Sequence, residues 1–358
     1  MKEKFLRELA DIQTGPFGSQ LHKEDYVADG TPIVTVEHLG NKMFSEQNLP
    51  RVSNTDKNRL KKYVLKQGDI VFSRVGSVDR CSYVDQKHDG WMFSGRCLRV
   101  RPTSEIDSEY LYYYFCLEET KQFVRNIAVG ATMPSINTKL LGEVVVTFPE
   151  LEQQKRISGI LSAIDSKIEV NQKINDNLSD LLQTIYQGQF GKVGLANNCG
   201  ILADICSYSK DKIEISKLSL DTYYSTENML PEKSGAVKAT SLPTTSQTTA
   251  CHKGDTLISN IRPYFKKIVY CEDDCGCSTD VLCFKPVHPR YTAYLFSTLY
   301  ADSFFNFMVA GAKGTKMPRG DKQQIMTYPV VLPSEKDLSE FNSVATPILT
   351  QIYSNVQV

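Results

Sequence analysis

The sequence predicts an α+β protein in which one β-rich unit, followed by a long amphipathic helix, is written twice. Three observations predict it: an internal repeat, the same order of β-rich and helical segments in each half, and an apolar helical stripe after each half. The chain has 358 residues, which is long for one ordinary globular core. We therefore expect two tandem units rather than one domain.

The internal repeat consists of blocks that recur in one order. The segment Gly68–Arg74 matches Gly254–Asn260, an offset of 186 residues. The offset then settles at 184 residues, and the later matches are Ser94 with Ser278, Pro102 with Pro286, Tyr110-Leu111 with Tyr294-Leu295, Gly130–Pro134 with Gly314–Pro318, and Val146–Pro149 with Val330–Pro333. Such a series in nearly one register indicates a tandem duplication.

Each unit begins with short β-rich runs that Gly and Pro interrupt, such as Ile33–Val36, Asp69–Ser73 and Cys97–Arg101. A helix rich in aromatic residues follows, then a polar loop and a last strand, Val144–Phe148 or Val330–Leu332. The helix positions are Tyr110, Leu111, Tyr114, Phe115 and Phe123 in one unit and Tyr294, Leu295, Phe304 and Phe305 in the other. The run Tyr112–Tyr114 is either a stacking platform for bases or part of the core, and its helical spacing favours the core.

A long helix is predicted from Leu151 to about Phe190, with a similar segment from Ser334 onward. Apolar residues in a 3–4 alternation are typical of a coiled-coil seam, and the alternation places Asn171 and Asn175 on the seam too. A helix of 40 residues with one apolar stripe needs a partner. The predicted seam residues are Ile157, Leu161, Ile164, Ile168, Asn171, Leu178 and Leu182 in the first helix and Leu338, Phe341 and Ile348 in the second.

These segments predict four regions. Residues 1–149 form the first unit, 150–192 a helical spacer, 193–333 the second unit and 334–358 a short C-terminal helix. The stretch Gly191–Gly200 is the expected boundary between the repeats.

Composition excludes several classes of protein. The net charge is zero, so the chain as a whole does not attract a polyanion. Binding to DNA would therefore need local clusters of cations or a partner subunit. No apolar run reaches the ~20 residues that cross a bilayer, and Met1–Lys4 does not open a signal peptide, so we expect a cytoplasmic protein. The ten cysteines are then expected to be free thiols.

The sequence predicts no metal site, no cofactor and no catalytic activity. The densest thiol group, Cys271, Cys275, Cys277 and Cys283, lacks the spacing of a zinc site, and the five histidines are scattered. A phosphate-binding G-x-x-x-x-G-K-[ST] loop is missing, as are a G-x-G-x-x-G turn, an adenine-methyltransferase N-P-P-[YF] motif and a nuclease-like acidic cluster.

Several short motifs stand in order along the chain: Gly15–Ser19 (GPFGS), Gly68–Ile70 (GDI), Gly130–Asn137 (GATMPSIN), and the helix start Pro149–Ile157 (PELEQQKRI) with its continuation Asp165–Glu169 (DSKIE). Each motif alone is weak. In this order, with the repeat and a helix after each unit, the chain resembles the specificity (S) subunits of type I restriction–modification enzymes over essentially its whole length.

The resemblance implies two target-recognition domains, each of which reads one half of a split, asymmetric DNA site. It also implies two helical regions that pair antiparallel and dock modification subunits, and through them restriction subunits, while catalysis belongs to those partners. Two features depart from the family pattern. A GPFGS-type entry is missing near Leu220–Tyr223, and the second helix is short, for which the expectation is a weaker assembly or a homodimer.

Reading DNA requires cations for phosphates and forked or amide side chains for base edges. The candidates for DNA binding in the first unit are Lys23, Arg74, Arg80, Arg96, Thr132, Ser135 and Asn137, and those in the second are Arg262, Lys266, Lys267, Lys313, Lys316 and Arg319. For any single one of them, a solvated loop position is the alternative.

Two other functions stay open. The near-neutral charge also suits a scaffold whose two modules bind only proteins, and an enzyme with a dispersed site is a more remote reading. Salt-dependent binding of duplex DNA separates the first alternative from the reader, because phosphate contacts make affinity fall with salt.

Overall fold

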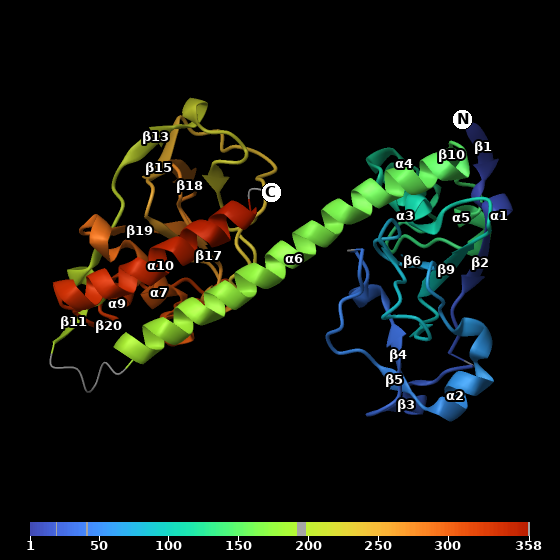
Figure 1. Ribbon diagram of the computed structural model, residues 1–358, viewed down its shortest axis with the longest axis horizontal. Coiled ribbons are helices and arrows are strands. Elements are labelled where there is room, and N and C mark those ends of the chain that lie inside the picture. The colour runs from blue at the N-terminus through green and yellow to red at the C-terminus, as the bar shows by residue number, and fades with distance from the viewer. Residues whose placement is uncertain (19, 41, 192–197, 357–358) are drawn as a thin grey trace. The chain divides into compact units, whose positions relative to one another are not determined.

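The computed structural model describes residues 1–18, 20–40, 42–191 and 198–356 (Figure 1). Contacts divide the chain into two compact units, Met1–Lys167 and Ile168–Val358. Each unit combines helices with a two-stranded sheet and two four-stranded sheets within the described residues, which confirms the α+β class and the two sheet-rich units. The division falls inside the long helix, so the four boundaries expected from the sequence remain predictions.

The first unit is built on a main antiparallel sheet of order β2-β9-β6-β7, with β2 Ala10–Thr14, β6 Ile70–Ser73, β7 Cys81–Tyr83 and β9 Cys97–Pro102. A second sheet has the order β3-β5-β4-β8, with β3 Tyr26–Val27, β4 Thr31–Val34, β5 Arg51–Val52 and β8 Met92–Phe93. Strand β1 (Lys2–Phe5) pairs antiparallel with β10 (Val145–Phe148). The helices are α1 Leu6–Leu9, η1 Lys23–Asp25, η2 Val36–His38, α2 Asn54–Arg59, η3 Lys61–Tyr63, α3 Ser108–Cys116, α4 Glu118–Ile127, α5 Thr138–Leu141 and the start of α6 Leu151–Phe190.

The second unit repeats the strand order of the main sheet, whereas its second sheet has a different order. Its main sheet has the order β12-β19-β16-β17, with β12 Cys206–Tyr208, β16 Thr256–Ser259, β17 Ile268–Tyr270 and β19 Val281–Pro286. The second sheet has the order β13-β15-β18-β14, with β13 Lys212–Glu214, β14 Tyr223–Tyr224, β15 Gln247–Cys251 and β18 Cys275–Cys277, and β11 (Cys199–Ile201) pairs with β20 (Pro329–Val331). The helices are η5 Leu202–Asp204, η6 Ile215–Lys217, η7 Pro263–Phe265, η8 Pro289–Tyr291, α7 Thr292–Tyr300, α8 Asp302–Ala310, α9 Lys322–Met326 and α10 Glu335–Val356.

The repeated Gly-Asp pair forms the same turn in both units. Gly68 and Gly254 have φ of 90° and 91°, a conformation that side chains with a Cβ rarely adopt. The carboxylate of Asp69 accepts a hydrogen bond from the Lys66 N–H, as Asp255 does from the His252 N–H. The turn therefore leads directly into β6 and β16, which are inner strands of their sheets. This shared structural role explains why the sequence block recurs in both units.

The aromatic segment of each unit is two helices, where the sequence pattern suggested one. Leu117 and Ala301, which are equivalent residues, have extended backbones with ψ of 134° and 141° and break the chain between α3 and α4 and between α7 and α8. Leu111, Tyr112 and Phe115 are buried in the core of the first unit. The interpretation of this run as core is therefore confirmed for Tyr112.

In the second unit, α10 lies antiparallel to the C-terminal half of α6 (Figure 1). The Asn171 Nδ2 donates to the Asn355 carbonyl at 3.2 Å and Asn175 Nδ2 to the Ile352 carbonyl at 3.2 Å. At the other end, the rings of Phe190 and Phe341 are 5.5 Å apart. Of the predicted seam residues, Leu182, Leu338, Phe341 and Ile348 are buried here, and Leu178 packs on the same core.

Candidate nucleic-acid interface

Loops of the first unit meet around Arg74, at the end of β6. The Arg74 N–H donates to the Arg96 carbonyl at 2.8 Å, and the Arg74 carbonyl accepts from the Ile136 N–H at 2.9 Å. Its guanidinium donates to the Gly95 carbonyl at 3.1 Å and stacks over the Phe17 ring, 5.3 Å from the centroid. Arg74, a predicted DNA-binding residue, thus connects its own loop to the loops that contain Phe17, Arg96 and Ile136.

Two glycines allow these loops to touch. A Cβ on Gly15 would lie 2.1 Å from the Ser94 carbonyl oxygen, and a Cβ on Gly95 would lie 2.3 Å from the Pro16 carbonyl oxygen. Both contacts are with backbone, which cannot move aside as a flexible side chain does, so only glycine fits. The GPFGS entry is therefore a packing motif that holds the loop 15–18 against the turn 94–96; its Ser19 lies outside the described residues.

A pocket of ≈600 Å³ opens beside this contact. Phe17, Tyr26, Glu37 and Arg96 are among the residues that line it, and the Phe17 side chain is 52% exposed. Sequence reasoning selected Arg96 but missed the other three. The GPFGS motif and the Ser94-Gly95-Arg96 turn were the available signals, because Gly beside an aromatic or a cation often marks a close backbone approach.

The second unit brings the equivalent loops together. The Ser259 hydroxyl donates to the Ile261 carbonyl at 3.2 Å, as the Ser73 hydroxyl does to the Val75 carbonyl at 2.8 Å. Isolated bridges join Ile261 and Lys313 to Arg319, and the same bridges join Val75 and Val129 to Ser135. Each repeat therefore builds its own loop assembly of the same kind, at the end of β6 in the first unit and of β16 in the second.

The predicted cations of the second unit lie in these loops, and most have an internal partner. Lys266 pairs with Asp302 at 3.0 Å, Lys313 with Asp321 at 2.5 Å and Arg319 with Asp280 at 3.0 Å. The Lys267 Nζ donates to the Thr226 carbonyl at 2.6 Å, and burial lowers the pKa of Lys267. The exposed Lys316 has no such partner among the described residues.

The remaining candidates in the first unit differ in whether their side chains form hydrogen bonds within the protein. Arg80 donates to the Leu39 carbonyl, and the Ser135 hydroxyl donates to the Val129 carbonyl at 3.3 Å. The Asn137 Oδ1 accepts from the Leu140 N–H at 2.9 Å and caps α5, a role that Asp321 has for α9. Thr132 is exposed, and Lys23 begins η1, with a side chain that lies outside the described residues.

The loop after β16 has a feature that sequence reasoning only partly found. Arg262 and Lys266 have left-handed backbones, with φ of 50° and 51°, on either side of η7. Between them, Tyr264 and Phe265 are 46% and 36% exposed. Strained backbone and exposed aromatic rings between cations are both typical of binding loops, and the run Arg-Pro-Tyr-Phe-Lys-Lys was the available signal.

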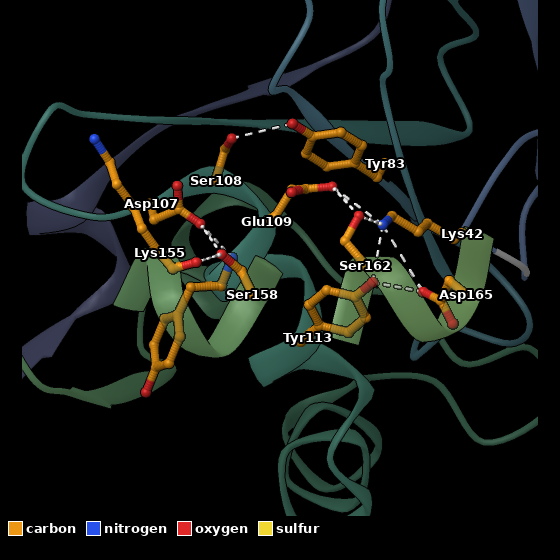
Figure 2. A network of polar contacts seen from close by, with 11 residues as sticks. Lys42, Tyr83, Asp107, Ser108, Glu109, Tyr113, Lys155, Ser158, Ser162 and Asp165 are labelled. Atoms are coloured by element: carbon orange, nitrogen blue, oxygen red, sulfur yellow. Dashed lines mark hydrogen bonds and ion pairs between the residues drawn. The ribbon is translucent and has the colours of Figure 1, made fainter. Parts of the chain in front are cut away.

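The N-terminal part of α6 packs on the first unit through polar side chains (Figure 2). The Lys42 Nζ lies 3.1 Å from the Glu109 carboxylate and 3.8 Å from that of Asp165, and it donates to the Tyr113 and Ser162 hydroxyls at 2.8 and 2.9 Å. Burial and the Asp165 carboxylate, whose oxygen accepts the Tyr113 hydroxyl at 2.6 Å, raise the pKa of Tyr113. The contact is therefore a network of charges and hydroxyls.

One turn earlier, the same face of α6 binds the start of α3. The Asp107 N–H donates to Gln154 Oε1 at 2.8 Å. The Ser158 hydroxyl donates to Asp107 Oδ1 at 2.8 Å (Figure 2). Gln154 and Ser158 are buried. Figure 2 shows the network extending along the helix from Ser158 to Asp165.

The apolar stripe on this part of α6 is exposed. Ile157, Ile160, Ile164 and Ile168 are 36%, 58%, 50% and 43% exposed, and Leu161 is half-buried. The helix–helix contacts of the second unit described above involve residues 171–190, so the seam positions predicted at Ile157, Leu161, Ile164 and Ile168 remain predictions. The stripe is exposed because the polar face, with its network of charges, is the one that packs on the first unit.

The structure identifies no obvious chemistry in these loops. Among the described residues, no group of three or more His, Cys, Asp or Glu side chains is arranged to hold a metal ion. Cys271, Cys275, Cys277 and Cys283 lie in a buried cluster, where the thiols of Cys271 and Cys275 are 3.6 Å apart. No described helix combines the length and apolar character needed to span a membrane.

Residues 1–180 match the family model described as "Type I restriction modification DNA specificity domain". This match covers half of the chain. The chain belongs to the type I restriction–modification specificity family. The main sheet of the second unit has the same strand order as that of the first, so the second half shares the main sheet of the matched domain.

Two curated members of this specificity family are similar over part of the chain. The type I restriction enzyme HindI specificity subunit of Haemophilus influenzae is 28% identical over 133 residues, which is 36% of this chain and 29% of that protein. The MjaVIII specificity subunit of Methanocaldococcus jannaschii is 26% identical over 190 residues, which is 48% of this chain and 41% of that protein. The chain thus matches less than half the length of either relative.

The fold is also that of a solved specificity subunit. The crystal structure of the type I restriction–modification S subunit from M. genitalium superimposes with a TM-score of 0.59 and 16% identity, covering 99% of this chain and 91% of that one. The recognition of the specificity family from sequence motifs is confirmed by these matches.

Proposed function

We propose that this specificity-family chain reads a bipartite, asymmetric DNA sequence for a type I restriction–modification system, without catalysing a reaction itself. The observation that carries the proposal is the loop assembly built at the end of β6 and again at the end of β16. Two such assemblies on one chain give two places to contact a duplex. They act on DNA in the cytoplasm, with residues 1–149 and 193–333 as the two readers.

The asymmetry of the site follows from the polar groups that the two assemblies present. Where the first unit has Arg74 and Arg96, the second has Asn260 and Asp280. In the other loop, Thr132 and Ser135 of the first unit correspond in the repeat to Lys316 and Arg319 of the second. Arginine, amide and carboxylate side chains select different base edges in the major groove. Equivalent loops with different side chains should therefore read different half-sites.

The charge of the chain suits a reader that makes few phosphate contacts of its own. Lys266, Lys313 and Arg319 are paired with carboxylates, and each pair is partly exposed to solvent. Ion pairs in contact with solvent contribute little to stability, so a DNA phosphate can replace the carboxylate at low cost. The chain alone should bind DNA weakly, and its affinity should fall with salt because phosphate contacts release counterions.

The exposed stripe of α6 supports the second part of the proposal, the docking of modification subunits and, through them, restriction subunits. Four isoleucines on one helical face expose 36–58% of their surface. Contiguous apolar residues on a helix usually mark a binding face. Replacing Ile160 and Ile164 with Glu should abolish co-purification with modification subunits and leave the fold of both units intact. A dimer of the chain alone that the same substitutions dissolve would instead assign the face to a second copy.

The function is tested by co-expressing the chain with the modification subunits of its operon and mapping adenine methylation on genomic DNA. A single split, asymmetric motif that disappears without this chain is the expected result. Exchanging residues 1–149 for those of another family member should then change one half of the motif only. A stable complex whose methylation does not depend on this chain would refute the proposal.

A protein scaffold is the second candidate, because the net charge is zero and most cations of the second unit are internally paired. The two candidates differ in a duplex-binding titration. The reader loses affinity steeply between about 50 and 200 mM salt, since each phosphate contact adds to the slope. A scaffold binds no duplex at either salt concentration.

A further inference from the structure

The pocket of the first unit contains two opposite charges that do not pair. Arg96 and Glu37 both line it, and both side chains are exposed. Among the described residues, neither side chain has a hydrogen bond or ion pair, whereas most candidate cations of the second unit have one. Opposite charges that share a pocket without meeting are arranged for a ligand that offers an acceptor to one and a donor to the other.

The internal repeat marks the Arg96 position as one where the two readers differ. Ser94 and Ser278 are equivalent, so Arg96 corresponds to Asp280 on the same turn before β9 and β19. In the second unit, Asp280 forms an ion pair with Arg319 at 3.0 Å. The residue of the first unit that is equivalent to Arg319 is Ser135, which has no charge. The framework is retained and the charge at this position is inverted, which is the pattern expected of a residue that selects a base.

A phosphate group does not fit this pocket well. The Glu37 carboxylate would repel it, and phosphate sites usually gather several cations or main-chain N–H groups. A G·C pair does fit. In the major groove, guanine presents the acceptors O6 and N7, which match the fork of an arginine, and its cytosine presents the N4 amino donor, which matches a carboxylate. The exposed rings of Phe17 and Tyr26 add apolar walls on which a base edge can rest.

We propose that Arg96 and Glu37 together read one G·C base pair of the first half-site, with Arg96 on the guanine and Glu37 on the cytosine amino group. The assignment rests on the proposed function, because it presupposes that the first unit contacts DNA. Arg74 acts as a positioning residue: it holds the turn of Arg96 through the Gly95 carbonyl and the Arg96 main chain. Gly15 and Gly95 keep that turn against Phe17.

The test uses the full chain assembled with its modification subunits and a library of duplexes with a randomised central segment. Bound duplexes are sequenced, and relative affinity is obtained for each base at each position. The wild type should prefer G·C at one position of one half-motif by about 5- to 150-fold over other pairs. Arg96→Ala and Arg96→Lys should both abolish that preference, since lysine keeps the charge but not the fork. Glu37→Ala should relax the same position, and every other position should stay unchanged.

The matched control is Lys61→Ala, which removes an exposed cation of the same unit that does not line the pocket. It should leave the motif unchanged. If Arg96→Ala weakens binding equally for all sequences while Arg96→Lys restores it, Arg96 contacts a phosphate and the proposal is overturned, although the chain still reads DNA. The same holds if the Arg96 and Glu37 variants relax different positions. If no motif depends on the chain, the proposed function fails as well.

Discussion

Replacing Lys42 with Met should loosen the attachment of α6 to the first unit. The Lys42 side chain is 13% exposed. It forms ion pairs with the Glu109 and Asp165 carboxylates and donates hydrogen bonds to the Tyr113 and Ser162 hydroxyls (Figure 2). Methionine has a similar length and no charge, so both carboxylates would lose their cation while little space is vacated. The loss should therefore be electrostatic.

The magnitude follows from these contacts. A hydrogen bond to a charged group contributes about 1.5–3 kcal/mol, and Lys42 donates two to hydroxyls beside its carboxylates. Glu109 and Asp165 are 30% and 34% exposed, so water partly replaces the ammonium group. We expect the free energy of unfolding of the first unit to fall by about 2–4 kcal/mol, less than the loss for a fully buried pair.

The single tryptophan makes this measurable in the full chain. Trp91 packs against the core of the first unit, so its fluorescence during urea unfolding reports that unit. The matched control Lys61→Met removes an exposed cation and should change the free energy of unfolding by less than about 0.5 kcal/mol. Adding Asp165→Asn to Lys42→Met should cost less than the two single changes together, because the partners interact. A Lys42→Met variant as stable as the control would refute the reasoning.

Three further predictions concern packing and thiol chemistry. Gly95→Ala should destabilise the first unit by about 1–3 kcal/mol in the same Trp91 assay, because its Cβ would meet the Pro16 carbonyl oxygen, whereas Gly18→Ala meets nothing within 4 Å and should be silent. Phe341→Ala should lower the free energy of unfolding of the second unit by about 3–5 kcal/mol, seen as an earlier thermal loss of the near-ultraviolet tyrosine signal, since Phe341 is fully buried among Tyr186, Phe190 and Tyr294. Val344→Ala, on the exposed side of α10, should leave that transition in place. A hydrogen bond from Cys81 lowers the pKa of the Cys116 thiol to about 7. Its alkylation by iodoacetamide should therefore rise with pH around a midpoint near 7, and Cys81→Ala, which removes the donor, should move the midpoint up. A midpoint near the ordinary value of 9 in the parent chain would contradict that assignment.

The sequence determined the repeated architecture of this protein because the relevant signals are local. Blocks such as Gly68–Arg74 and Gly254–Asn260 recur since their turns need a left-handed glycine at a fixed place. The bounds of α6 follow from its apolar periodicity and from Pro149 before it, and they agree with the structure at Leu151–Phe190. Asn171 and Asn175 were placed on the seam by the same periodicity, and both bond to α10.

Tertiary structure decided what these elements contact, because that depends on residues far apart in the chain. Periodicity gave α6 one apolar seam; the structure packs its polar face on the first unit, since Lys42 and Glu109 arrive there from distant segments. The pocket likewise arises where loop 15–18 meets turn 94–96 through two glycines. Whether a cation is available was also undecidable from sequence: Arg319 is held by Asp280 and Arg74 by the Gly95 carbonyl, while Arg96 has no such partner among the described residues. Charge can be counted along a chain, but its pairing is set by the geometry of the fold.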